Sequence, residues 1–195
     1  IAGAFATDRA RAMFETNYFG PVALTRAVRP AMRAQRSGRL IHITSGVGRF
    51  TMPGMAHYAA TKWALEAFSE SLRYELASLG IESTAVEPGA FKTEIFGKLM
   101  EPAEPERIAD YGDIANIAHG FQGGLDQFFA SEAYRGPEIV TEAIVDLIEA
   151  EPGSAPARVA VGADVQTVAE LNELVAGKQR ELLAAFGMEA FQALA

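Results

Sequence analysis

The sequence predicts an α/β protein built on a doubly wound, Rossmann-like parallel sheet. Short apolar segments with the periodicity of strands alternate with longer amphipathic segments that have the periodicity of helices. The strands end at glycine or proline, and the helices between them are long enough to connect parallel strands. The 195 residues, 49% of them hydrophobic, suffice for one domain with a sizeable core.

Because only about three strands can be identified, we expect residues 1–195 to form a single incomplete domain, the C-terminal portion of such a fold. A doubly wound sheet that binds a dinucleotide usually begins with a strand, a glycine-rich turn and a helix. Neither GxxxGxG nor GxGxxG occurs in the chain. We therefore expect that the sequence omits the part of the fold that carries this turn.

The first long helix is predicted from Arg9 to about Gln35, after an N-cap at Thr7-Asp8. Within it, Gly20-Pro21 is expected to kink or distort the helix. A strand around Ile41 follows, in which apolar and polar residues alternate until glycines end the run.

The next helix is predicted from about Met55 to Leu79, with Gly80 as its C-terminal stop. A second strand, 81–86, is broken by Pro88-Gly89. Residues 90–136 are predicted to be irregular, with at most a turn or two of helix. Such a long segment in a compact domain is often a substrate lid, and a plain helical cap is the alternative.

The remainder of the chain repeats the alternation of helix and strand. A helix is predicted to start at Gly136-Pro137, with proline in its first turn, and to end at 151–153. Residues 158–162 form a short strand of the buried type. Asp164 is expected to cap a last helix that runs to about Phe186.

Three reactive side chains are expected to meet at one end of the predicted sheet. Ser45 lies at the carboxyl end of the first strand, where ligands bind in open α/β sheets. Tyr58 and Lys62 are four residues apart on a helix, so both project from one face. A hydroxyl, a phenol and an ammonium in one crevice indicate proton transfer to or from a carbonyl or alcohol.

Electrostatics favours a role for the phenol as an acid or base. A free tyrosine titrates near pH ~10, and we expect the neighbouring ammonium of Lys62 to lower the pKa of Tyr58. We expect Glu87, near the end of the second strand, to be solvated.

These residues resemble the signature of the short-chain dehydrogenases/reductases. Tyr58-Ala-Ala-Thr-Lys62 is similar to the YxxxK motif, and Ser45 stands thirteen residues before Tyr58, the usual place of the family's serine. Asn17 in FETNYFG and the segment PGAFKT, from Pro88 to Thr93, complete the set. The resemblance covers most of the chain and extends to single-domain members related to steroid and retinol dehydrogenases.

The resemblance implies an NAD(P)-dependent oxidoreductase that interconverts an alcohol and a ketone or aldehyde. The aromatic-rich segment 90–136 predicts that the substrate is a largely apolar small molecule. The resemblance also implies that Tyr58 transfers the proton, Lys62 tunes it and holds the cofactor ribose, Ser45 orients the substrate oxygen and Asn17 supports a water relay. The cofactor-binding residues that it implies are Tyr58, Lys62, Pro88, Gly89, Phe91 and Thr93. The choice between NADP and NAD stays open, because the selecting residue would accompany the absent glycine-rich turn.

Two other functions remain open. One is an epimerase or dehydratase that retains its NAD, although residues 90–195 are short for a sugar-nucleotide domain. The other is a truncated homologue that binds no cofactor and serves as an oligomerisation partner. In the family, the helices predicted at 9–35 and 55–79 form a four-helix contact, so a homodimer or homotetramer is expected.

The composition of the chain restricts the classes of binding partner and the cellular compartment that we expect. A net charge of −8 argues against nucleic acid or an anionic membrane as the main partner. Cysteine is absent and the histidines lack metal-ligand spacing, so we expect no disulfide and no metal site. No apolar run reaches the roughly 20 residues that cross a bilayer, and the first residues do not resemble a signal peptide. We therefore expect a cytoplasmic protein.

Overall fold

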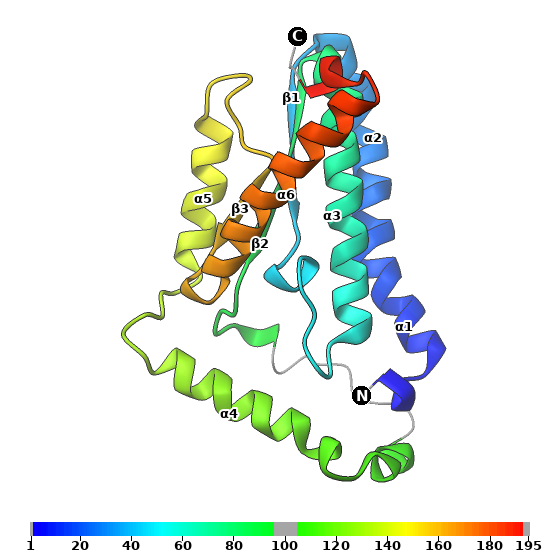
Figure 1. Ribbon diagram of the computed structural model, residues 1–195, viewed down its shortest axis with the longest axis vertical. Coiled ribbons are helices and arrows are strands. Elements are labelled where there is room, and N and C mark those ends of the chain that lie inside the picture. The colour runs from blue at the N-terminus through cyan, green and yellow to red at the C-terminus, as the bar shows by residue number, and fades with distance from the viewer. Residues whose placement is uncertain (1, 96–104, 193–195) are drawn as a thin grey trace.

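The computed structural model describes residues 2–95 and 105–192 (Figure 1). Its strands are β1 (Gly38–Ile43), β2 (Ile81–Pro88) and β3 (Arg158–Val161), which form one parallel sheet in the order β1-β2-β3. The α-helices are α1 (Thr7–Phe14), α2 (Gly20–Gln35), α3 (Ala56–Leu76), α4 (Ile117–Phe129), α5 (Glu138–Glu149) and α6 (Gln166–Ala185). The α/β class and the parallel pairing of consecutive strands are confirmed.

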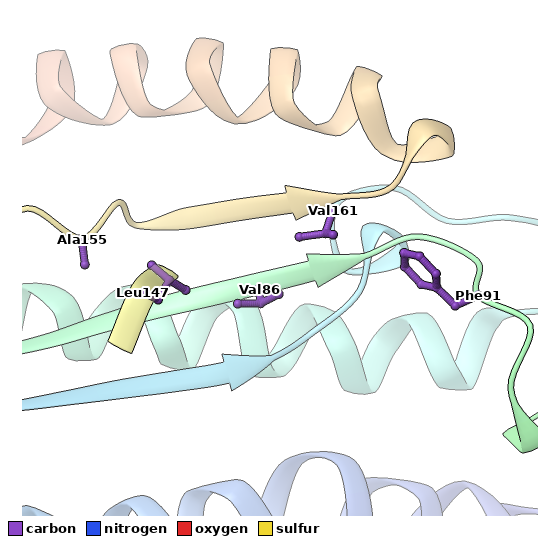
Figure 2. Close-up of a cluster of buried hydrophobic side chains, with 5 residues drawn as sticks. All are labelled: Val86, Phe91, Leu147, Ala155 and Val161. Carbon is purple, nitrogen blue, oxygen red and sulfur yellow. The ribbon is translucent and has the colours of Figure 1, made fainter. Parts of the chain in front are cut away.

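Helices cover both faces of the sheet. Helices α2 and α3 pack on one face, through a core that contains Leu40, Leu72, Leu76 and Ile81. Helix α5 packs on the other face, where Figure 2 shows the second core, formed by Val86, Phe91, Leu147, Ala155 and Val161. Because side chains alternate along a strand, β2 is buried on both faces, as is usual for a central parallel strand.

The long first helix is distorted one turn earlier than the sequence predicts. A π-helical turn (Glu15–Phe19) separates α1 from α2, and the amide of Gly20 bonds to the carbonyl of Glu15, five residues back. Pro21 has no amide hydrogen to offer the carbonyl four residues before it, so the wider turn is formed where an α-helical bond would be lost. Helix α1 begins at Thr7 itself without a side-chain cap, so the predicted N-cap is wrong.

The predicted irregular segment contains a helix that the sequence pattern hides. A 3₁₀ segment (Pro105–Asn116) leads into α4, which lies apart from the other helices beside the lower end of the sheet in Figure 1. Three glycines, at 120, 123 and 124, interrupt the apolar periodicity of α4, and each costs about 1 kcal/mol relative to alanine in a helix. Residues 96–104 of the predicted lid lie outside the described residues.

The described helices give no sign of a membrane span. Within residues 2–95 and 105–192, none combines the length and the apolarity that crossing a bilayer requires.

Candidate active site

The loop after β1 places Ser45 at the carboxyl edge of the sheet. The Ser45 hydroxyl donates to the carbonyl of Pro88 (3.4 Å) and accepts the amide of Val47 (3.4 Å). The following glycines allow this loop to pack tightly. A Cβ on Gly46 would lie 2.5 Å from Val165 Cγ1, and one on Gly48 would lie 3.3 Å from the backbone of Lys62.

Helix α3 brings the phenol and the amine to this loop. The Lys62 Nζ atom donates to the carbonyl of Ile43 (3.0 Å) and lies 5.7 Å from the centroid of the Tyr58 ring. The Ser45 side chain lies near enough to the Tyr58 phenol to lower the pKa of that phenol. The structure therefore brings together the serine, tyrosine and lysine that the sequence singles out.

Burial controls the titration of both groups on α3. It raises the pKa of Tyr58, and the side chain of Ser45 offsets part of this rise. The predicted lowering of the Tyr58 pKa by Lys62 is wrong for this structure, because the ammonium faces the ring and the Ile43 carbonyl. Burial also lowers the pKa of Lys62 to about 8, while the negative charge of Glu66, one turn along α3, opposes this shift.

Asn17 lies in the π-helical turn, against the start of α3. Its Nδ2 donates to Thr61 Oγ1 (3.1 Å), and this hydroxyl donates to the carbonyl of Tyr58 (2.7 Å). A wider helical turn of this kind is often found at functional sites. The side chain of Asn17 is therefore fixed to the helical turn that carries Tyr58 and Lys62.

The loop after β2 forms the neighbouring wall of the site. The Gly89 amide donates to the carbonyl of Val161 (2.9 Å) and the Ala90 amide to Asp164 Oδ2 (2.8 Å). A Cβ on Gly89 would lie 2.0 Å from Asp164 Oδ1, so only glycine fits beside this carboxylate. The Phe91 side chain packs in the core, and the Thr93 hydroxyl accepts the amide of Ile95 (3.4 Å).

Two acidic residues near this edge of the sheet were misjudged from the sequence. Asp164 does not cap the last helix but binds the loop after β2. Its position directly after a parallel strand, like that of Ser45, is the signal that could have identified it. Glu87 is completely buried, with a relative exposure of 0%, so its predicted solvation is wrong.

An apolar hollow lies near the start of α3, the helix that carries Tyr58 and Lys62. Its lining comes from the loop before α3 and from α4, and its volume is about 260 Å³. The lining residues are Met52, Pro53, Ile117, Gly120 and Phe121.

The part of the chain that the structure describes contains no group of three or more histidine, cysteine or acidic residues placed to hold a metal.

Comparison with known proteins agrees with this geometry. The sequence profile of the short chain dehydrogenase family matches residues 2–104. Oxidoreductase BOA17 of Botryotinia fuckeliana is 34% identical over 177 residues, which are 89% of this chain and 58% of that protein. A short-chain dehydrogenase from Streptomyces avermitilis superposes with a TM-score of 0.66 at 32% identity, over 94% of this chain and 65% of that one.

A third comparison is the closed form of serine dehydrogenase complexed with NADP+. It has a TM-score of 0.64 at 25% identity, over 85% of this chain and 60% of that one. The chain thus spans less than two thirds of each of these proteins.

The amine of Lys62 should titrate near pH 8 in the protein without ligand, because its burial favours the neutral form. Replacing Glu66 with glutamine should lower this pKa further, since the opposing negative charge is removed. The chain has only four lysines (Lys62, Lys92, Lys98 and Lys178), so a pH titration of ¹³C-labelled lysine can resolve each one. Glu75→Gln, an exposed change later on α3, is the control. An unaltered Lys62 titration in the Glu66 variant would contradict this assignment.

Replacing Asp164 with alanine should free the loop after β2, because the Ala90 amide loses a charged acceptor. Hydrogen bonds to charged groups contribute about 1.5–3 kcal/mol, so exchange of the Ala90 amide should accelerate roughly 10- to 100-fold. Hydrogen exchange followed by NMR measures this rate. Asp146→Ala, on the outer face of α5, serves as a control. Equal protection of Ala90 in both variants would show that Asp164 does not hold the loop.

Proposed function

Since the chain belongs to the short-chain dehydrogenase family of oxidoreductases, we propose that it supplies the catalytic half of an NAD(P)-dependent reductase. The proposed reaction interconverts a ketone or aldehyde with an alcohol. The observation that carries this proposal is the meeting of Ser45, Tyr58 and Lys62 at the carboxyl edge of a parallel sheet.

The residues present fit the nicotinamide end of the cofactor. Gly89 lets the loop after β2 pass beside the Asp164 carboxylate, at a point where a Cβ would collide with that carboxylate. The half-buried Lys62 supplies an amine as a donor for ribose hydroxyls, and the main chain from Pro88 to Thr93 supplies polar groups for the nicotinamide amide. When bound, the nicotinamide supplies or accepts the hydride. The NADP+ complex of serine dehydrogenase supports NADP as the first cofactor to test.

In the proposed reaction, residues of this chain transfer the proton. Burial keeps the Tyr58 phenol protonated at neutral pH, which is the form that donates to a carbonyl oxygen. Ser45 donates a second hydrogen bond to the same oxygen and stabilises the charge that develops on it. Lys62 stays mostly protonated at neutral pH, given a pKa of about 8, and holds a positive charge next to the ring. Asn17 keeps this turn of α3 in place through Thr61.

The segment 90–136 is proposed to close over the substrate. Helix α4 lines the apolar hollow with Ile117, Gly120 and Phe121, opposite Met52 and Pro53. An apolar lining recognises a substrate with an apolar body. Glycines within α4 reduce its helical stability, which suits an element that moves.

Turnover should require the phenol oxygen of Tyr58. Replacement by phenylalanine should reduce the rate by about 10²- to 10⁴-fold, the usual contribution of a general acid, while cofactor affinity changes little. The rate is measured from the loss of reduced nicotinamide with a panel of apolar aldehydes and ketones, and affinity from nicotinamide fluorescence. Tyr74→Phe makes the same change further along α3, where the phenol bonds to Glu70. This control should leave the turnover rate and the cofactor affinity unchanged. Full activity in Tyr58→Phe would refute the assignment.

We also propose that two copies of the chain associate through α2 and α3. Large apolar side chains are exposed on this layer: Leu24 (67%), Trp63 (47%) and, at its start, Phe19 (49%). A charge at the centre of such a face should prevent association, because it would be buried unpaired. Trp63→Glu should therefore elute as a monomer in light-scattering chromatography, whereas Phe186→Glu, on another exposed apolar position, should not differ from the parent protein. A monomeric parent protein would rule out this contact.

A further inference from the structure

A buried cluster of charged side chains lies behind the Ser45 loop, between β2, β3, α3 and α6. Arg158 donates from Nε to Glu66 Oε2 (2.9 Å) and from Nη2 to Glu70 Oε2 (2.8 Å). Its Nε also lies 3.7 Å from Glu87 Oε1. Arg49 Nε lies 3.8 Å from the same Glu87 oxygen. The cluster therefore contacts helix α3, the end of β2 and the loop after β1, which carry or adjoin Tyr58, Lys62 and Ser45.

Glu87 is the least well compensated acid of the cluster. Arg158 gives its two short bonds to Glu66 and Glu70. Lys62, one turn before Glu66 on α3, adds a positive charge beside that residue. Glu87 is completely buried, and the two guanidinium groups lie 3.7 and 3.8 Å from its Oε1, beyond hydrogen-bond distance. That oxygen has no donor among the described residues. Burying a poorly compensated charge is costly, and in practice such a group changes its protonation state instead.

We propose that Glu87 is held as a neutral carboxylic acid and that, in this form, it is a positioning residue for the active site. This inference rests on the proposed function for its purpose, but not for its protonation state. A carboxylic acid supplies one donor, which a carboxylate lacks, and it carries no charge that would need a closer cation.

The contacts of Glu87 explain how it positions the site. It directly precedes Pro88, whose carbonyl accepts the Ser45 hydroxyl. Asn172 of α6 donates to Glu87 Oε2 (2.5 Å) and accepts from Arg49 (2.8 Å), which follows the Ser45 loop. Glu87 thus links the end of β2, helix α6 and the loop after β1 through one amide side chain. An ionised Glu87 would be a buried charge without a hydrogen-bonded cation, and the three elements would separate to admit water.

The titration of Glu87 agrees with this assignment. Burial and the charge of Glu66 raise its pKa to about 7, against the lowering effects of Asn172, Arg158 and Arg49. Helix α3 also places the negative charge of Glu70 and the positive charges of Lys62 and Arg73 near the cluster. Asn172 and Gln179, which join α6 to the cluster by hydrogen bonds, are uncharged. Because the folded protein holds this proton more tightly than the unfolded chain does, stability falls as the pH rises from the ordinary glutamate value through 7.

Glutamine has the shape of the neutral acid and cannot ionise, so Glu87→Gln should preserve the fold and Glu87→Ala should not. Thermal unfolding of both variants and the parent protein, from about pH 5 to about pH 9, tests this. We expect Glu87→Gln to match the parent at the acid end and to melt above it at the alkaline end. Glu70→Gln, in the same cluster, should melt below the parent throughout, because it loses bonds to Arg158 and Gln179. A Glu87→Gln variant as unstable as Glu87→Ala at every pH would overturn the proposal.

Two measurements need neither a cofactor nor a substrate, so they can fail or succeed independently of the proposed reaction. In the parent protein labelled with ¹³C at glutamate Cδ, one carboxyl should titrate near neutrality and be missing in Glu87→Gln. The Gly48 amide, which bonds to the Ser45 carbonyl (2.8 Å), should lose protection from exchange above pH ~7 in the parent but not in Glu87→Gln. Glutamates that all titrate in the ordinary acid range would refute the neutral acid, and equal Gly48 protection at all pH values would refute the positioning role.

Discussion

The bond from the Lys62 amine to the carbonyl of Ile43 determines the arrangement of the site. It joins helix α3 to the last residue of β1, and it requires the Ser45 loop to pass directly over the helix. Gly46 and Gly48 make that passage possible, because a side chain at either position would meet Val165 or the Lys62 backbone. The amine is buried as a result, and its pKa falls to about 8. The proximity of serine, tyrosine and lysine and their altered titration therefore have a common origin in close packing.

Close packing at this edge has an electrostatic consequence further inside. Glu66 opposes the loss of the Lys62 proton, but its own carboxylate is buried and must be held by Arg158. That arginine brings Glu70 and Glu87 into the same region, and Glu87 is left without a hydrogen-bonded cation. A site that holds an amine against the sheet thus depends on a charged support, and in our proposal that support contains a neutral acid.

The parts of the site that could be predicted from the sequence depend on short-range geometry. Tyr58 and Lys62 share a helix face because they are four residues apart, and Ser45 lies at a strand end marked by glycines. Glu87 and Asp164 were misjudged because their surroundings come from distant elements. An acidic residue next to Pro88-Gly89 looks like part of a solvated turn until β3 and α6 cover it. The helix α4 was missed because its glycines resemble loop residues, whereas the distortion near Gly20-Pro21 was predicted within one turn.

The two sides of the proposed site differ in rigidity. The side that handles the proton is formed by strand ends, by α3 and by buried ion pairs, so small shifts there would break several bonds at once. The side that faces the apolar hollow is formed largely by α4, whose three glycines weaken it as a helix. Substitutions in α4 can therefore change which apolar group fits the hollow while the proton-transfer geometry stays the same. This separation of tasks fits a fold in which one chemistry is combined with many substrates, and it directs the search for the substrate of this chain to the residues of α4.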